Sequence, residues 1–191
     1  MKVEWVRSYL GHQAAVYALL PGRTAEEGFL SAGGEGWIAR WLVGKDDGHL
    51  VGKADTSLFG LAQMDDRLAV GGLDARLYLI DEQNNQVRAL ENHRKGIYRL
   101  YRNGPDLISL GADGNLTRWS SREWLPEFTL KISHHALRSF ARMDEDSLWV
   151  GSSDGNIYLV NLYSGQVLQQ INAHEPSVFS LVYDPVRELL I

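Results

Sequence analysis

Short apolar runs bounded by Gly, Asp and Asn recur along the whole chain. No stretch shows a strict helical period, and runs of this length between turn residues are typical of β-strands. In the first part of the chain they predict strands over residues 16–20, 29–32, 38–43 and 50–53. Equivalent sets begin near Leu58, Ile97, Leu137 and Val178. The pattern therefore predicts an all-β protein built from repeated sets of short strands.

A glycine-rich acidic turn repeats at a nearly constant interval. Successive acids lie 39, 39 and 41 residues apart; they are Glu35, Asp74, Asp113 and Asp154. A bulky residue follows each acid by six positions and keeps the same interval; these residues are Trp41, Ile80, Trp119 and Val160. A period near 40 residues with four short strands per unit is typical of the blade of a β-propeller.

The histidines add a second repeated feature. Gly11-His12 lies about 20 residues before the first turn acid, and further histidines follow in phase at His93, at His134 or His135, and at His174. Together with the turn acids and the tryptophans, this pattern resembles the WD40 repeat family, and the resemblance covers essentially the whole chain. It implies an all-β fold, a β-propeller of four-stranded antiparallel blades, with four complete blades and partial flanking strands.

The repeat also predicts where the blades begin and end. Complete blades are expected at about residues 14–53, 57–92, 96–133 and 136–172, with a partial blade at about 176–191. Residues 3–10 match an outer strand, which closes the ring in this family. Because such rings usually have about seven blades, we expect the chain to be part of a seven-blade ring. Closure as a five-blade ring is the alternative.

The resemblance implies a structural network of hydrogen bonds inside each blade. Its members are a His, a Ser or Thr ten residues before the Trp, the turn acid and the Trp. The third and first blades carry the full set, which comprises His93, Ser109, Asp113 and Trp119, and His12, Ser31, Glu35 and Trp41. The second blade keeps Asp74, the fourth keeps Asp154 with His134 or His135, and His174 is expected to begin the next set.

The same residue types would also suit a nucleophilic triad. The structural interpretation is favoured because the set recurs in several blades, and because Val replaces Ser where the network is lost. Asp113-Gly114-Asn115 lacks the alternating oxygens of a calcium loop. The histidines are mostly spread one per blade, and no phosphate-binding loop is present. We therefore expect no catalytic residue, no metal and no cofactor.

One further column of residues does not belong to the structural network. An aromatic residue follows His12, His93 and His174 by five positions, and the in-phase positions of the other blades hold Phe and Arg. This set is called the rim column here; it comprises Tyr17, Phe59, Tyr98, Arg138 and Phe179.

In WD-repeat proteins the rim-column position begins the innermost strand and lies on the top face of the ring. The resemblance therefore implies a surface that docks a protein or peptide, and aromatic residues and Arg are common in interface hot spots. The alternative is that the rings pack in the channel wall or between blades. The small residues two positions earlier, among them Ala15 and Gly96, favour accessible rings.

Basic residues cluster just after His93. They are Arg94, Lys95, Arg99 and Arg102. We expect Arg102 to lie in a loop and the others to form a solvated rim, because Arg99 and Arg102 alternate poorly on one strand.

Charge and composition narrow the classes of function. A net charge of -5 and a pI near 5.7 give no reason to expect a nucleic-acid partner. The longest apolar run, residues 14–20, is far shorter than the roughly 20 residues that span a bilayer. There is no cysteine, which excludes disulfides and fits a reducing compartment. We expect a cytoplasmic protein with no membrane segment.

The functional prediction is a non-catalytic scaffold that docks a protein or peptide on its top face. Because the repeat stops within a blade, unpaired strand edges predict self-association or complementation by a second propeller fragment. A structural role based on that assembly is therefore the alternative function. An enzyme built on the propeller channel is a third possibility, but the inward positions hold aromatic and small residues and no paired carboxylates.

Overall fold

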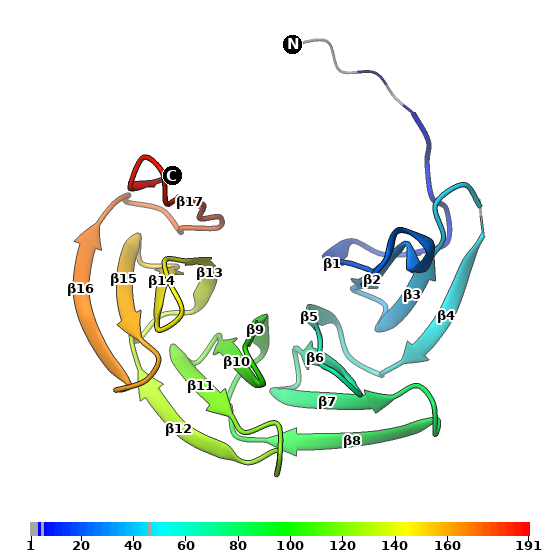
Figure 1. The fold of residues 1–191 in the computed structure, drawn as a ribbon, viewed down its shortest axis with the longest axis horizontal. Coiled ribbons are helices and arrows are strands. Elements are labelled where there is room, and N and C mark those ends of the chain that lie inside the picture. The colour runs from blue at the N-terminus through cyan, green and yellow to red at the C-terminus, as the bar shows by residue number, and fades with distance from the viewer. Residues whose placement is uncertain (1–3, 5, 46) are drawn as a thin grey trace.

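The computed structural model of the chain describes residues 4, 6–45 and 47–191. Four antiparallel sheets of four strands each stand side by side around a common centre and form an open arc (Figure 1). In each sheet the strands follow in sequence order, with the first on the inside of the arc and the fourth on the outside. The chain is therefore a partial β-propeller, and the predicted fold class is confirmed.

Each sheet forms one blade. Blade one comprises β1 (Val16–Pro21), β2 (Phe29–Gly33), β3 (Trp37–Trp41) and β4 (Gly48–Lys53). Blade two comprises β5 (Leu58–Gln63), β6 (Leu68–Gly72), β7 (Arg76–Asp81) and β8 (Gln86–Glu91). Blade three comprises β9 (Ile97–Asn103), β10 (Asp106–Gly111), β11 (Asn115–Trp119) and β12 (Pro126–Lys131). Blade four comprises β13 (Leu137–Arg142), β14 (Ser147–Ser152), β15 (Asn156–Asn161) and β16 (Gln166–Asn172).

The tight turn between the second and third strands of each blade needs one residue with positive φ. Gly36, Gly114 and Gly155 take this position with φ of 82°, 76° and 83°, whereas blade two uses Ala75 with φ of 70°. A Cβ on Gly114 would lie 1.9 Å from the backbone oxygen of Ser133. Blade three therefore requires glycine at its turn, for both conformation and space.

The hydrophobic core lies between neighbouring blades. Leu58 of β5 is fully buried in one cluster with Leu30 and Ile38 of blade one. Trp119 of blade three belongs to a cluster with Leu77 of blade two. Since the middle strands bury both faces in this way while β8 and β16 remain largely exposed, each blade is held by its neighbours.

The N-terminal prediction is corrected. Residues 3–10 were expected to form an outer strand, but the described residues 4 and 6–10 form no strand, and residues 3 and 5 lie outside the described part. Tyr9 instead packs its ring edge-on against Phe29 and Trp41, with ring centroids 5.1 Å and 5.7 Å away. The ring of Tyr9 therefore packs against the side of blade one.

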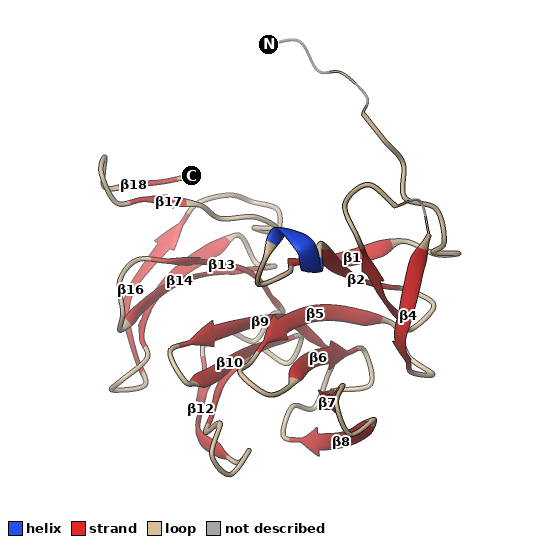
Figure 2. Cartoon of the chain, turned by 45° about the vertical axis from the view of Figure 1, so that its right-hand side comes forward, coloured by secondary structure: helices blue, strands red, loops and turns tan. Residues whose placement is uncertain are grey.

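The C-terminal prediction is also corrected. A partial blade was expected over about residues 176–191, with its first strand beginning near Val178, but only a small hairpin of β17 (Tyr183–Asp184) and β18 (Leu189–Leu190) forms (Figure 2). The N–H of Val178 donates to Ser152 O at 3.1 Å, and its carbonyl accepts from the hydroxyl of Ser139 at 2.8 Å. The backbone of Val178 is therefore bonded to blade four, and Val178 and Leu181 pack against the face of that blade that lies away from blade three.

The described residues contain one helical segment, the 3-10 turn η1 (Ala25–Glu27) between β1 and β2 (Figure 2). No helix among them is long and apolar enough to cross a membrane.

In blade one, β3 ends at Trp41, two residues before the predicted end, and Gly44 follows in a turn with φ of 90°.

Candidate functional site

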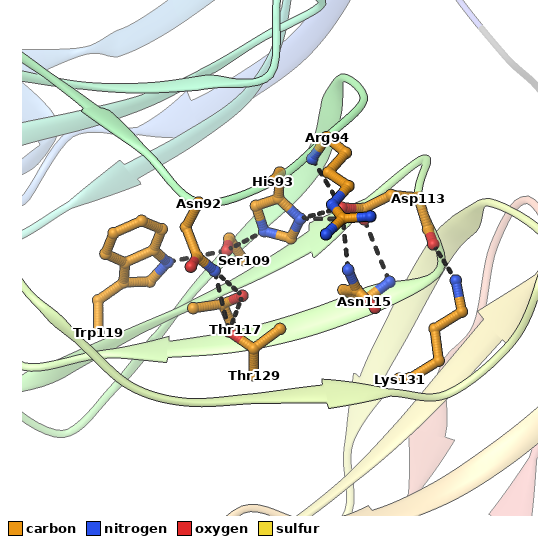
Figure 3. Close-up of polar contacts among 10 residues, drawn as sticks. All are labelled: Asn92, His93, Arg94, Ser109, Asp113, Asn115, Thr117, Trp119, Thr129 and Lys131. Atoms are coloured by element: carbon orange, nitrogen blue, oxygen red, sulfur yellow. Dashed lines mark hydrogen bonds and ion pairs between the residues drawn. The ribbon is translucent and has the colours of Figure 1, made fainter.

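A buried chain of hydrogen bonds crosses blade three (Figure 3). Trp119 Nε1 donates to Ser109 Oγ at 2.8 Å, and Ser109 Oγ lies 2.7 Å from His93 Nε2. His93 Nδ1 is 3.0 Å from Asp113 Oδ1. Because Asp113 as a carboxylate only accepts, His93 donates from Nδ1 and receives the hydroxyl proton of Ser109 at Nε2. Every donor in the chain then has an acceptor.

The carboxyl of Asp113 has a low pKa in this chain of hydrogen bonds. Burial raises the pKa, but hydrogen bonds from His93 and from the N–H groups of Arg94 and Asn115 outweigh burial and lower it to about 2. The Arg94 N–H donates at 2.9 Å and the Asn115 N–H at 3.2 Å. Asp113 is therefore ionised at neutral pH and stabilises the turn before β11.

Blade one contains the same chain with Glu35 in the place of the aspartate. Trp41 Nε1 donates to Ser31 Oγ at 2.7 Å, Ser31 Oγ lies 2.6 Å from His12 Nε2, and His12 Nδ1 contacts Glu35 Oε1. The longer side chain of Glu35 leaves its Oε2 buried without a hydrogen-bond partner in the described part of the chain. The first blade therefore satisfies its turn acid less completely than the third.

Blades two and four use tyrosines that the sequence interpretation missed. Tyr78 donates its hydroxyl to Asp74 at 2.5 Å, and Tyr158 donates to Asp154 at 3.4 Å. Each tyrosine follows its acid by four residues. Ser133 also donates to Asp154, at 2.9 Å. The interval of four residues between acid and tyrosine, which occurs in both blades, was the available signal in the sequence.

The histidine predictions for the fourth and fifth repeats are wrong. His134 and His135 are exposed. In blade four it is the hydroxyl of Ser133 that donates to the turn acid, Asp154. His174 is exposed as well, and no side-chain hydrogen bond joins it to another residue of the described chain. The reason is local: the loop before β13 turns inward one residue earlier than expected, at the buried Ser133.

The rim column forms a continuous row of contacts along the inside of the arc. Tyr17 and Phe59 have ring centroids 4.6 Å apart, and Phe59 and Tyr98 meet edge-to-face at 5.1 Å. The Cζ of Arg138 lies 4.4 Å from the centroid of Tyr98 and 5.7 Å from that of Phe179. The structure thus brings all five residues together, from four blades and the C-terminal segment.

The local backbone explains why these side chains leave the sheets. Each strand residue of the column is the second residue of its inner strand and sits at a register shift of the ladder between the first and second strands. In blade two, for example, Leu58 faces Gly72 and Gly60 faces Gly71, so Phe59 has no partner. Such β-bulges redirect a side chain away from the ladder. The four bulges therefore aim the column in one direction.

Exposure differs along the column. Tyr17 is 46% exposed and Phe179 is 64% exposed, whereas Phe59, Tyr98 and Arg138 are half-buried. The two ends of the column thus present open aromatic surface, and the three central residues support one another. An accessible surface and mutual packing coexist in the same row.

A groove of about 480 Å³ runs along the inner strands beside the rim column. Its lining includes Tyr17, Phe59, Arg99, Tyr101 and Phe140. Aromatic groups joined by a few polar side chains are characteristic of sites that bind a ligand or peptide. The column and the groove together form the candidate functional site.

The expected position of Arg102 is corrected. It lies within β9, because that strand continues to Asn103, which pairs with Asp106. Its guanidinium donates to Gly104 O at 2.9 Å and to the carboxylate of Asp65 at 2.7 Å. Arg102 therefore links blade three to blade two.

Arg99 is not part of a solvated rim either. Arg94 and Lys95 are exposed as expected, but Arg99 is half-buried on β9 and lines the groove. Its Nη1 donates to Tyr98 O at 3.0 Å. Arg99 is a site residue that the sequence interpretation assigned to ordinary surface.

Metal ligands do not gather in this part of the molecule. Within the described ranges, no group of three or more His, Asp or Glu side chains could hold a metal ion. The chemistry available at the candidate site is therefore aromatic stacking, cation–π contact and hydrogen bonding from guanidinium groups.

Comparison with known proteins supports the fold. No family model matches the chain. The chain is 22% identical over 212 residues to the meiotic recombination protein rec14 of Schizosaccharomyces pombe, an alignment that spans 100% of this chain and 67% of that protein.

Solved structures show a stronger likeness. The computationally designed Ika8 protein aligns with a TM-score of 0.77 and 20% identity over 92% of this chain, and this chain spans only 55% of Ika8. The computationally designed Ika4 protein aligns with a TM-score of 0.64 and 19% identity, covering 70% of this chain and 84% of that protein. At these identities the likeness is one of fold alone, namely a set of β-propeller blades.

Proposed function

We propose that this chain is a non-catalytic scaffold of the WD-repeat type that docks a protein or peptide on the rim column. The observation that carries the proposal is the continuous row of Tyr17, Phe59, Tyr98, Arg138 and Phe179, aimed in one direction by successive β-bulges. Large aromatic side chains and arginine supply most of the binding energy at protein interfaces. The proposed setting is the cytoplasm, with no nucleic acid or membrane as partner.

Burial supports a scaffold over an enzyme. In blade three, the hydroxyl of Ser109 is bonded to the ring of His93 and accepts a hydrogen bond from Trp119. Ser109 is 0% exposed. A nucleophile must reach its substrate, so this arrangement suits a structural role. The repeat of the same chain in blade one supports that assignment.

The test is selection of binding peptides from a displayed random library, followed by affinity measurement on purified variants. Tyr17→Ala combined with Phe179→Ala should weaken binding at least about tenfold, because both rings are open at the ends of the column. Tyr163→Ala is the matched control, since Tyr163 is 82% exposed outside the column. Peptides that bind the double variant as tightly as the unmodified chain would contradict the proposal.

A second candidate function is assembly through the ends of the arc. The face of blade one that lies away from blade two carries a cavity of about 280 Å³, lined mainly by apolar groups that include Trp37, Trp41 and Leu50. A second propeller fragment, or a second copy of the chain, could cover this face as the blades cover one another. Light scattering that gives the mass of one chain in solution would exclude self-association.

A further inference from the structure

Arg138 is held by aromatic rings and has no acidic partner among the residues that the structure describes. It extends from β13 with its guanidinium between Tyr98 and Phe179, at 4.4 Å and 5.7 Å from the ring centroids. Its Nε is buried and has no hydrogen-bond acceptor among the described residues. A guanidinium positioned in this way keeps its charge and part of its donor capacity available.

Arg99 brings a second cation to the same place. It lies on β9, which packs against β13 across the boundary between blades three and four. Its single hydrogen bond in the described chain, from Nη1 to Tyr98 O, satisfies one of five N–H groups. Both arginines contact Tyr98, Arg99 through its carbonyl and Arg138 through its ring. Burial lowers the pKa of Arg99, and the positive charge of Arg138 lowers it further.

The other half-buried arginines of the described chain show how unusual this pair is. Arg40, Arg67 and Arg118 each have a carboxylate oxygen within 4.0 Å, at 2.7 Å, 3.3 Å and 2.6 Å respectively. Within the described residues, neither Arg99 nor Arg138 has one. Since the chain has 24 acidic and 19 basic residues, acids are plentiful elsewhere. The pair is therefore an uncompensated positive centre beside the rim column.

We propose that Arg99 and Arg138 form a binding site for an oxyanion carried by the docked peptide. Two guanidinium groups supply several N–H donors in fixed planes, which is the arrangement that binds carboxylate and phosphate oxygens. Tyr98 and Phe179 restrict the orientation of Arg138, so little conformational freedom is lost on binding. The partner is therefore an acidic peptide, with its oxyanion supplied by a carboxylate side chain or by a phosphorylated residue.

This inference rests on the proposed docking function for the peptide, but the anion site is testable without any peptide. The probe is sodium phosphate, with sodium acetate and sodium chloride at matched ionic strength, added to the ¹⁵N-labelled chain. The Nε–H signals of Arg99 and Arg138 are followed by NMR. Saturable shifts with phosphate or acetate are expected, and the stronger of the two identifies the phosphoryl or carboxylate source. Shifts that chloride reproduces equally would overturn the proposal.

Variants give a second, independent readout. Arg99→Gln should weaken the binding of phosphate about tenfold or more, because hydrogen bonds to a charged group are lost. It should also raise the melting temperature in the absence of anions, because it removes the repulsion from Arg138. Arg88→Gln is the matched control, since Arg88 is exposed on the outer strand β8, and neither property should change.

A folded Arg99→Gln variant with unaltered phosphate affinity would overturn the anion site. The two proposals fail separately. If neither phosphate nor acetate binds but selected peptides still depend on Tyr17 and Phe179, the anion site alone is wrong. If phosphate or acetate binds at Arg99 and Arg138 but no peptide depends on the column, the docking proposal alone is wrong.

Discussion

Blades two and three have the same four-stranded sheet but bury different chemistry between their second and third strands. In blade three, Ser109 faces Thr117 across the ladder and accepts a hydrogen bond from Trp119. In blade two, Val70 faces Tyr78 at the same place. β6 and β10, the second strands of the two blades, consist of buried residues. One sheet geometry therefore accommodates a polar chain or an apolar pair.

Although their buried chemistry differs, the blades share one requirement, a hydrogen-bond partner for the turn acid. In blade three the turn acid Asp113 is bonded by His93, and in blade two Asp74 is bonded by the hydroxyl of Tyr78. Blade four resembles blade two, since Val150 faces Tyr158 and Tyr158 reaches Asp154. A turn acid with a hydrogen-bond partner is common to all three blades, and the route to that partner varies.

The largest expected effect comes from removing the indole of blade three. Trp119→Ala should lower the free energy of unfolding by about 3–5 kcal/mol, because a side chain that is 1% exposed leaves a cavity. Ile80→Val, at the equivalent position of blade two, should lower it by only about 0.5–1.5 kcal/mol. Urea denaturation followed by tryptophan fluorescence and circular dichroism measures both. Equal losses would show that the two blades do not differ as described.

An intermediate effect is expected from acid. The pKa of Asp113 is about 2 in the folded chain, below the value near 4 of an unfolded chain. Its contribution to stability is therefore complete above about pH 4 and is lost as the pH falls from about 4 towards about 2.

Asp113→Asn is the variant that isolates this contribution. Its unfolding free energy should fall less steeply between pH 4 and pH 2 than that of the unmodified chain. Part of the slope should remain, because the pKa values of Glu35 and Asp154 are also lowered: burial raises them, but hydrogen bonds, which include those from His12 and from Ser133 respectively, outweigh it. Denaturation curves across this pH range provide the measurement, and an unchanged slope would contradict the assignment.

The smallest effect concerns the turn of blade two. Ala75 adopts φ of 70°, where blades one, three and four have glycine. Ala75→Gly should raise the free energy of unfolding by about 0.5–1 kcal/mol, because relief of the left-handed conformation outweighs the extra freedom of glycine in the unfolded chain. The reverse change, Gly36→Ala in blade one, should destabilise, since its Cβ would lie 2.0 Å from Ala54 O. Thermal unfolding of the two variants should move in opposite directions.

The site was only partly predictable from the sequence. The positions of the rim column followed from its spacing, because four of its members are the second residues of inner strands that recur in phase. Tyr158 was missed because the expected partner of Asp154 was a distant histidine, and Tyr78 because no partner was expected for Asp74. Each tyrosine lies on the strand that follows its acid. Arg99 was missed because a charge cluster in a sequence is usually solvated, and its burial depends on the neighbouring blade.

The sequence by itself determined the blades, since each strand pairs with the next one along the chain and the turns between them require local residue types. It also determined the polar chains of blades one and three, whose members lie within a single repeat. Only the tertiary structure decided which side chains meet across blade boundaries. The pairing of Arg99 with Arg138, and the course of the segment around Val178, depend on how one sheet packs against the next. That packing joins residues about 40 positions apart, and no local pattern encodes it.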